Sequence, residues 1–377
     1  MEKKKVQLTS ILPKKKEKES FYRLDNILAQ NCLYNMIIGE RSNGKTYACI
    51  EYALKEYIDN GYQSAYIRRW DEDFKGKRGQ QLCSGHSEFI EKYTKGEWTK
   101  VSYYSGKWYL ARRDDDMDKD VRDEEPFMFA FGLNAMEHDK STSYPNITTI
   151  IFDEFITRQY YLRDEFILFV NVLSTIIRHR DNVKIFMLGN TVNKWCIYFT
   201  EMGLKHVPEM DLGKIDVYNY GDSGLSVAVE RCRPNSKKGK KSDKYFAFDN
   251  PALKMITGGA WEIDIYPHLP EKYNRDKIQY IFFINFNDNL LQCEVVEGKK
   301  GLFIYIHNKT TRLQENDYDL IYSAEYSPAI NHRRNILKPQ LNIEKKISTL
   351  IKSEKVFFQD NEIGEVYRNY LMFCRSM

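Results

Sequence analysis

The chain has 377 residues, of which 42 % are apolar and 14 % aromatic, and a formal net charge of +4 at pH 7. These values allow one large core and a second, smaller one, so we expect two domains. The longest apolar stretch, residues 166–177, is interrupted by Asn171 and is too short to cross a bilayer, so no membrane span is predicted. The seven cysteines stand singly, without the spacing of a zinc site, and favour a reducing cytosol.

Lysines cluster at residues 3–5, 14–16 and 237–241. Runs of this kind suit a polyanion better than the average charge suggests. The N-terminus has lysines but lacks the apolar core and cleavage site of a secretory signal. We therefore expect residues 1–20 to form a flexible basic arm, either solvated without a partner or bound to a polyanion.

From residue 33 the sequence alternates strands and helices. A strand at 33–38, a helix from 45 to about 60 and a strand at 64–69 predict a βαβ unit. Three more buried strands are expected, at residues 127–131, 148–152 and 183–188. Apolar residues recur at helical spacing over 166–177, and a helix that includes Trp195 and Tyr198 follows the last strand. The pattern predicts an α/β fold with a mostly parallel sheet, in which functional residues lie at the carboxyl ends of strands.

Between the strands expected at 64–69 and 127–131, the alternation of strands and helices is less regular. A short helix is expected at residues 87–93, and a hairpin that turns at Ser105 and Gly106. The acidic stretch 114–125 is predicted to be a solvated loop.

After about residue 229 the composition changes. We predict a larger α/β domain at 21–228, a linker region at 229–258 and a smaller α+β domain at 259–377. In the last domain, strands are expected at 261–266, 278–286, 290–296 and 301–307, and helices at 343–353 and 362–374. The last three strands are joined by short turns and predict an antiparallel meander.

The octapeptide at residues 39–46 follows an apolar strand and opens a helix, as a phosphate-binding P-loop does. Its members are Gly39, Glu40, Arg41, Ser42, Asn43, Gly44, Lys45 and Thr46. The glycines let consecutive N–H groups surround a β-phosphate, and the helix directs its positive end at the same anion. Lys45 is expected to reach the β- and γ-phosphates, and the Thr46 hydroxyl to coordinate Mg²⁺. The alternative is a glycine-rich turn without a ligand.

Asp153 and Glu154 follow the buried strand at 148–152. Asp153 fits the Mg²⁺ shell, and Glu154 can activate a water in line with the γ-phosphate. A kinase needs no such base, so the pair favours hydrolysis, although a charged turn after a core strand remains an alternative. ATP is preferred over GTP because the segment that begins Asn193-Lys194 lacks the aspartate of a guanine-reading motif.

Asn190 ends the next strand, where it could sense the γ-phosphate or orient the attacking water. A plain turn that tolerates unusual backbone angles is the other interpretation. Arg178 and Arg180 close the helix after the carboxylates, where the helix dipole favours cations in any case. The alternative is an arginine finger that is donated to the site of a neighbouring subunit.

Together these segments resemble the DNA-packaging ATPases of phi29-like phages over most of residues 30–220. The P-loop is generic, and the stretch from Tyr144 to Ile156 together with the strand that ends in two arginines makes the likeness specific. The residues that carry it are Ile37-Ile38-Gly39 to Lys45-Thr46, Tyr66-Ile67-Arg68-Arg69, Lys140-Ser141, Tyr144-Pro145-Asn146, Phe152-Asp153-Glu154-Phe155-Ile156, Arg178-x-Arg180 and Leu188-x-Asn190.

The resemblance implies an ASCE-type ATPase that works as a homo-oligomeric ring, a pentamer, under a phage portal. Such a ring pumps double-stranded DNA into a procapsid in the host cytoplasm, with ATP and Mg²⁺ as cofactors and a packaging RNA as a candidate partner. Arg178 matches the residue that the family presents in trans, and Arg68 and Arg69 are implied to lie near the subunit interface or the DNA channel, with solvation at the edge of the core as the alternative. Relatives have a basic residue soon after this pair, but here Trp70 is followed by Asp71, Glu72 and Asp73.

The resemblance also implies a C-terminal domain with an RNase H-like fold that has lost its nuclease site. A two-metal nuclease needs clustered carboxylates, beginning in the first strand of the meander. Residues 281–286 contain no acid, and Asp288 lies in the turn. A binding platform without cleavage is therefore expected, and basic residues that could contact DNA, portal or RNA are Lys299, Lys300, Arg333 and Arg334.

Two other functions fit the sequence. The first is a large-terminase-type enzyme with an active C-terminal nuclease. The second is an assembly adaptor that binds nucleotide but does not pump.

Overall fold

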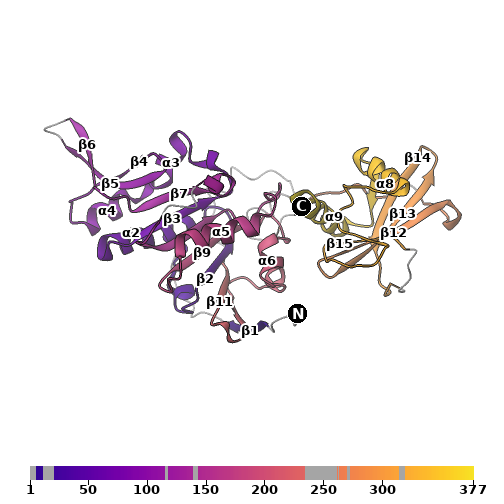
Figure 1. Cartoon of the computed structure of the whole chain (residues 1–377), viewed down its shortest axis with the longest axis horizontal. Helices are drawn as coiled ribbons and strands as arrows, with labels where there is room; N and C mark the ends of the chain where they lie inside the picture. The colour runs from indigo at the N-terminus through magenta and orange to yellow at the C-terminus, as the bar shows by residue number, and fades with distance from the viewer. Residues whose placement is uncertain are drawn as a thin grey trace, which may run out of the picture. The chain divides into compact units, whose positions relative to one another are not determined.

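The computed structural model describes residues 6–11, 21–114, 118–138, 143–233, 261, 263–269, 272–313 and 319–377. The chain divides into two compact units, one of residues 1–158 and 165–261 and the other of residues 159–164 and 262–377. Each unit is built on its own sheet (Figure 1). Among the helices of the described ranges, none is long and apolar enough to cross a membrane.

The first unit contains a sheet of eleven strands, in the order β1-β10-β11-β2-β9-β8-β3-β7-β5-β4, with β6 paired to β5. The bounds are β1 Val6–Ile11, β2 Tyr34–Gly39, β3 Gln63–Arg68, β4 Lys100–Tyr104, β5 Lys107–Asp114, β6 Lys119–Arg122, β7 Met128–Gly132, β8 Ile147–Asp153, β9 Lys184–Asn190, β10 Ile215–Tyr220 and β11 Ser226–Arg231. Neighbours from β11 through β7 are parallel, and the strands outside this block pair antiparallel.

The parallel block confirms the mixed α/β fold with a parallel-rich central sheet. Every residue of β8 is buried, and so are the five residues Ile185 to Gly189 of β9. Strands that are buried on both faces have continuous apolar runs rather than alternating ones. This is why the five expected strands of this block can be located from the sequence to within about two residues.

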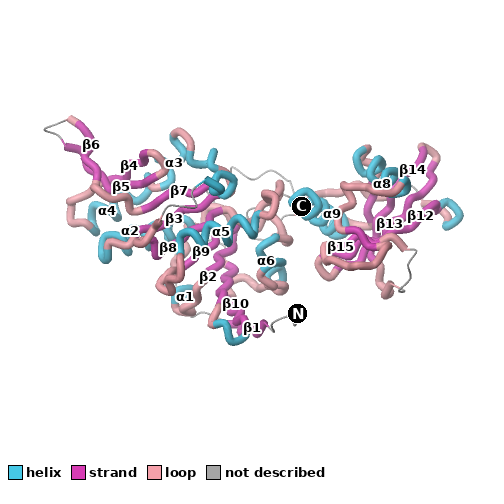
Figure 2. Tube along the Cα trace, viewed as in Figure 1, coloured by secondary structure: helices cyan, strands magenta, loops and turns pink. Residues whose placement is uncertain are grey.

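The two long helices of this unit were also predicted correctly. Helix α2 (Lys45–Asn60) ends at Gly61, whose φ of 71° is the left-handed conformation that suits a helix C-cap. Helix α5 (Glu165–Ile177) buries Phe169 and Leu173 one turn apart, and Phe169 stacks on Phe152 of β8 with ring centroids 4.9 Å apart. Figure 2 shows α5 lying across the strands of this sheet. The helix α6 (Ile197–Glu201) includes Tyr198, as expected, but begins after Trp195.

The acidic stretch 114–125 is not a loop throughout. Residues 119–122 form β6, which pairs antiparallel with β5, while residues 115–117 lie outside the described ranges. Asp120 accepts a hydrogen bond from Lys100 Nζ at 2.6 Å and lies 3.7 Å from Arg113 Nη1. Alternating charges that pair across strands therefore stabilise a strand where the composition suggested a solvated loop.

The predicted basic arm and the predicted domain boundary both differ from the structure. Residues 6–11 form β1, which pairs with β10 and is joined to it by the Ser10 hydroxyl, a donor to Asp216 Oδ1 at 2.7 Å. The remainder of the arm lies outside the described ranges. Strand β11 extends to Arg231, beyond the boundary expected at 228, and residues 234–260 of the linker region are also not described.

Trp261 was expected to begin a strand of the C-terminal domain, and this is wrong. It belongs to the first unit, where its indole Nε1 donates to the carbonyl of Pro208 at 2.8 Å. The guanidinium of Arg231 lies 5.3 Å from its ring centroid. A cation–π contact and an indole hydrogen bond fix this side chain without any strand pairing.

The second unit is built on a six-stranded sheet in the order β16-β15-β12-β13-β14-β17. Its bounds are β12 Ile278–Phe286, β13 Asn289–Gly298, β14 Gly301–Asn308, β15 Ile321–Ser323, β16 His332–Arg333 and β17 Val356–Phe358. The meander β12-β13-β14 is antiparallel and confirms the prediction, as do helices α8 (Asn342–Lys352) and α9 (Asn361–Ser376). The short strands β15, β16 and β17 each pair parallel with a neighbour.

A buried ion pair ties the end of β3 to α5 in the first unit. Arg69 Nε and Nη2 donate to the two carboxylate oxygens of Glu165 at 2.7 and 2.8 Å. The Tyr198 hydroxyl donates to the same carboxylate at 2.9 Å, and Glu165 is fully buried. A bidentate arginine pair with a further donor satisfies both charges inside the core.

Replacing Glu165 with Ala should lower the free energy of unfolding by about 3–5 kcal/mol, because the Arg69 guanidinium would remain buried without its carboxylate. Guanidinium denaturation measures this change. Glu201→Ala, at the exposed end of α6, is the matched control and should change stability by less than about 0.5 kcal/mol. Equal stabilities of the two variants would contradict this account of the ion pair.

Candidate functional site

The carboxyl ends of four neighbouring parallel strands bring most of the predicted residues together. Strand β2 ends at Gly39, β9 at Asn190, β8 at Asp153 and β3 at Arg68. The register places Gly39 opposite Asn190, and Asp153 opposite Leu188 of the same strand β9. This edge of the sheet is where open α/β folds build binding sites.

The glycine-rich loop has the backbone that its sequence predicts. Gly44 has φ 95° and precedes α2 in the left-handed conformation, and Ser42 has φ 60°. A Cβ atom on Gly39 would lie 2.8 Å from Cys232 Cβ, so no larger residue fits there without a shift. In the loop, Glu40 and Asn43 are buried, whereas Arg41 and Ser42 are exposed.

Lys45 directs its ammonium group into this loop. Its Nζ donates to the carbonyl oxygens of Glu40 at 2.8 Å and Gly39 at 3.3 Å. It also donates to Asn43 Oδ1 and to Asn190 Oδ1, both at 3.2 Å. Burial lowers the pKa of Lys45, and nearby acidic groups oppose that effect. The structure therefore brings together Lys45 and Asn190, which are 145 positions apart in the chain.

Thr46 and Asp153 meet at the same place. The Thr46 hydroxyl donates to Asp153 Oδ2 at 3.1 Å, and the Tyr66 hydroxyl donates to the same oxygen at 2.5 Å. Asp153 Oδ1 accepts from the Glu154 backbone N–H at 2.9 Å. A hydroxyl and a carboxylate oxygen in contact are hard ligands of the kind that Mg²⁺ requires, so the residues present fit the predicted ion.

Glu154 differs from Asp153 in exposure and in its partner. Its side chain is 58 % exposed, its φ is 59°, and its Oε2 lies 2.5 Å from Arg68 Nη1. The carboxylate lines a cavity of about 380 Å³ together with Tyr66, Arg68 and Arg78. Glu154 is thus held by one ion pair at the side of an open cavity.

The two arginines after α5 have different environments. Arg180 is half-buried and donates to the carbonyl oxygens of Pro145 at 2.8 Å and of Tyr144 at 3.2 Å. Arg178 is exposed and follows the last helical residue with φ 41°. Arg180 therefore fastens the helix end to the segment before β8, and Arg178 is presented to the surface.

The expectation that Arg69 lies near a subunit interface or the DNA channel is wrong. Arg69 is 7 % exposed and forms the buried ion pair with Glu165, so it does not lie on an interface or channel surface. The preceding residue, Arg68, forms an ion pair with Glu154 instead. Arg68 and Arg69 are successive residues at the end of an extended strand, where side chains point to opposite faces.

A contact that the sequence analysis missed supports the loop from the N-terminal side. The Tyr22 N–H donates to the carbonyl of Asn43 at 2.9 Å, and its hydroxyl donates to Glu230 Oε2 at 2.7 Å. Phe21 lies beside Gly44 and is 65 % exposed. Burial raises the pKa of Glu230 to about 7, and the hydrogen bond from Tyr22 partly offsets that shift. No sequence motif marks this segment.

Among the described residues, no group of three or more His, Cys, Asp or Glu side chains is placed to hold a metal ion. In the second unit, Asp288 lies in the turn after β12 with φ 61°. Asn285, not an acid, is the polar residue near the end of β12, where it pairs with Ser323 of β15.

Comparison with known proteins shows the family to which this chain belongs. The chain is a mixed α/β protein with a glycine-rich loop at the carboxyl edge of a parallel sheet, and residues 16–308 match the sequence model of the family described as podovirus DNA encapsidation protein (Gp16). This match covers most of the chain. The chain belongs to that family.

Two curated relatives are DNA packaging proteins. The protein of Bacillus phage phi29 is 28 % identical over 212 residues, which cover 54 % of this chain and 55 % of the relative. The protein of Bacillus phage B103 is 29 % identical over 188 residues, which cover 49 % of this chain and 52 % of the relative. The chain thus matches about half the length of each of these relatives.

Two solved structures share the fold. The phi-28 gp11 DNA packaging motor matches with a TM-score of 0.51 and 16 % identity, over 94 % of this chain and 98 % of that one. The bacteriophage phi-29 viral genome packaging motor assembly matches with a TM-score of 0.52 and 20 % identity, over 93 % and 100 %. At these identities the likeness concerns the fold alone.

Stability should depend on pH through Glu230. Its folded pKa lies above the ordinary value of 4.5, so the folded state holds the proton more tightly and loses stability as pH rises from about 4.5 to about 7. Glu230→Gln is neutral at every pH and should be more stable than the parent, by an amount that grows by about 2–3 kcal/mol between about pH 5 and pH 8. Thermal unfolding across this range measures it. Glu201→Gln, at an exposed position, is the control and should show no such pH dependence. A stability difference between Glu230→Gln and the parent that does not change with pH would rule out Glu230 as the titrating group.

Proposed function

We propose that this protein is an ATP-driven motor that moves double-stranded DNA into a phage procapsid. Membership of the encapsidation family supports the packaging role. The observation that carries the enzymatic part is the contact between Thr46 and Asp153, because it joins the glycine-rich loop to the acidic strand end. The interposed strand β9 and the glutamate directly after Asp153 support the ASCE-type prediction.

The nucleotide would bind with its phosphates in the loop of residues 39–46. Lys45 is positioned inside this loop and can exchange its carbonyl partners for phosphate oxygens. Thr46 and Asp153 would hold Mg²⁺, which neutralises charge on the phosphates when bound. Asn190 already contacts Lys45 and would face the γ-phosphate from the neighbouring strand.

Glu154 is the proposed general base. A carboxylate that is more than half exposed and lines a cavity can accept a proton from water, whereas Asp153 is buried and fixed by three donors. The ion pair with Arg68 turns the Glu154 carboxylate toward β3. The Glu154 carboxylate would therefore leave Arg68 when it contacts the attacking water.

The proposed assembly is a ring of identical subunits, a pentamer, beneath the portal of the procapsid in the host cytoplasm. The exposed position of Arg178 after α5 suits a side chain that completes the site of a neighbouring subunit. Double-stranded DNA would be gripped through its phosphates, since packaging must move every base pair and phosphate contacts carry no direct sequence information. A packaging RNA would be a further partner.

The second unit would act as a binding platform without nuclease activity, in an RNase H-like fold. The antiparallel meander with parallel strands on both sides supports this proposal. We assign residues 21–158 and 165–233 to the main part of the ATPase domain, and residues 159–164 and 262–377 to the platform, in line with the two compact units.

The whole proposal is tested by ATP turnover with and without long double-stranded DNA. Turnover that rises with DNA and falls with Lys45→Ala supports a motor. A protein that binds ATP but whose turnover does not respond to DNA would be an adaptor. Plasmid nicking in Mg²⁺ or Mn²⁺ that survives Lys45→Ala would indicate a nuclease instead.

Glu154→Gln should keep ATP binding and lower turnover by about 10²–10⁴-fold, because an amide cannot accept the proton of the water. Single-turnover hydrolysis and ATP binding are measured on the same preparation. Glu88→Gln, exposed in the first turn of helix α4 (Ser87–Tyr93), is the control and should behave like the parent. Unchanged hydrolysis in Glu154→Gln would remove Glu154 as the base.

Arg178→Ala should lower ring turnover by about 10³-fold or more if Arg178 acts as an arginine finger. Mixing it with Lys45→Ala subunits, which retain Arg178, should restore part of the turnover. His179→Ala is the neighbouring control, because His179 is also exposed and its backbone is also in the left-handed conformation, with φ 65°. The absence of restored turnover at every mixing ratio would show that Arg178 does not act in trans.

A further inference from the structure

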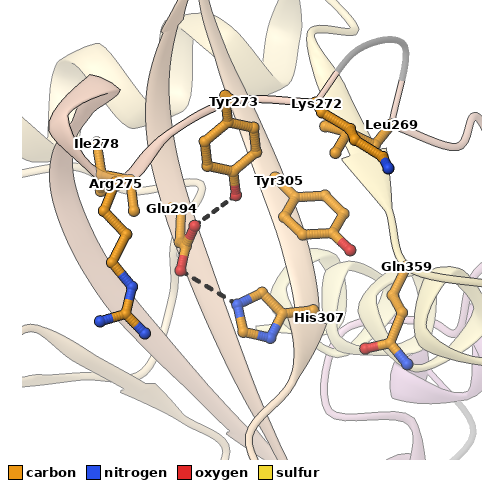
Figure 3. Close-up of a pocket in the computed structure, with 9 residues that line it drawn as sticks. All are labelled: Leu269, Lys272, Tyr273, Arg275, Ile278, Glu294, Tyr305, His307 and Gln359. Atoms are coloured by element: carbon orange, nitrogen blue, oxygen red, sulfur yellow. Dashed lines mark hydrogen bonds and ion pairs between the residues drawn. The ribbon is translucent and has the colours of Figure 1, made fainter.

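The second unit contains a cavity of about 460 Å³ that the proposed motor chemistry does not use (Figure 3). It lies on the face of the meander that carries Glu294 of β13 and Tyr305 of β14, which are directly opposite each other in the register. The alternate residues Cys293 and Ile306 point to the other face and are fully buried. Because neighbouring residues of a strand face opposite sides, the cavity side of the sheet is distinct from its apolar core side.

The centre of the cavity is an internal ion pair. His307 Nε2 lies 3.3 Å from Glu294 Oε1, and His307 Nδ1 lies 3.1 Å from the carbonyl oxygen of Asn308. Both ring nitrogens face acceptors, so the geometry favours the doubly protonated imidazolium. Hydrogen bonding to Glu294 raises the pKa of His307 accordingly. The carboxylate and the imidazolium then neutralise each other.

The remaining charges of the lining are positive. Lys272 and Arg275 are exposed, and within the described part of the chain their side chains make no hydrogen bond or ion pair. Figure 3 shows them on two sides of the Glu294 and His307 pair. A lining with two available cations around a neutral centre attracts an anion such as a phosphodiester.

The cavity also contains a platform of aromatic rings. Tyr305 stacks on His307 with ring centroids 5.4 Å apart at 29°. Tyr273 lies edge-on to Tyr305 with centroids 6.0 Å apart, and its hydroxyl donates to Glu294 Oε2. The rings are therefore held in place by one another and by the central carboxylate, as a stacking surface requires.

We propose that this cavity binds an unpaired nucleotide of a nucleic-acid strand, with its base against Tyr305 and His307 and its phosphates at Arg275 and Lys272. Aromatic rings beside cations are the combination that single strands use, because every base has a face that can stack. A base inside a duplex is already stacked on both faces, so the site selects unpaired segments. This activity goes beyond the movement of duplex DNA.

The cavity does not suit a catalytic metal. Glu294 is its carboxylate, and both of its oxygens already accept hydrogen bonds, from Tyr273, Gln292 and His307. A two-metal site would need further acids. Binding without cleavage is therefore the inferred role.

The test uses the full chain and a single-stranded oligonucleotide that carries one 2-aminopurine, as DNA and as RNA of the same sequence, with the blunt DNA duplex as a third probe. Single strands should bind and change the 2-aminopurine fluorescence. Tyr305→Leu should weaken binding by about 5- to 150-fold, whereas Tyr305→Phe keeps the ring and should stay within about twofold of the parent. Arg275→Ala should reduce the salt slope of binding by about 0.7.

The control variants are Tyr326→Leu, an exposed tyrosine of a loop outside this cavity, and Lys352→Ala, an exposed lysine at the end of α8. Both should bind like the parent. Preference for DNA or RNA identifies the source of the strand, and either one supports the site. The proposal would be overturned if Tyr305→Leu and Arg275→Ala left single-strand binding unchanged. It would also be overturned if the duplex bound with the same dependence on Tyr305. ATP turnover without nucleic acid should be unchanged in Tyr305→Leu, which separates this site from the motor.

Discussion

The contact between Thr46 and Asp153 is the constraint on which the proposed ATPase site depends. The strands that carry the loop and the acid, β2 and β8, are separated by β9, so their ends lie about 10 Å apart across the sheet. Helix α2 begins at Lys45, within the octapeptide, and places Thr46 beside Asp153. The interposed strand contributes Asn190, whose amide oxygen meets Lys45 in the gap. One strand order therefore places the loop lysine, the threonine hydroxyl, the acid and the amide around one small volume.

Asp153 and Glu154 are adjacent, yet their side chains differ in burial and in partners. Asp153 is 7 % exposed and receives hydrogen bonds from Thr46, Tyr66 and the Glu154 backbone. The Glu154 side chain is open to a cavity and has an ion pair with Arg68. Behind them, Arg69 of the buried ion pair also donates to the carbonyl oxygens of Glu154 and Phe155, at 3.2 and 3.0 Å. The proposed metal ligand is thus fixed and the proposed base is exposed, and the backbone next to both is held by Arg69.

The sequence indicates which residues meet at the centre of the candidate site because the signals there are local. The glycine-rich octapeptide, the apolar strands around it and the acids at a strand end each lie within a few consecutive residues. Contacts such as Tyr66 with Asp153 or Arg69 with Glu165 join residues 87 and 96 positions apart, and no local pattern reveals them. Strand β6 was missed because its stabilising charges pair across strands, and β15, β16 and β17 are too short to show a period. The roles of the site residues remain predictions that rest on this geometry.

The central claim, that Thr46 and Asp153 hold one magnesium ion with the nucleotide, is tested most directly by the binding of Mn²⁺ together with ATP, followed by electron paramagnetic resonance. Thr46→Ala and Asp153→Ala should each weaken the binding of the ion, and the double variant should be weakened by less than the sum of the two free-energy changes, because both groups serve the same ion. Single variants that bind Mn²⁺ and ATP like the parent, or effects that add fully in the double variant, would contradict the account.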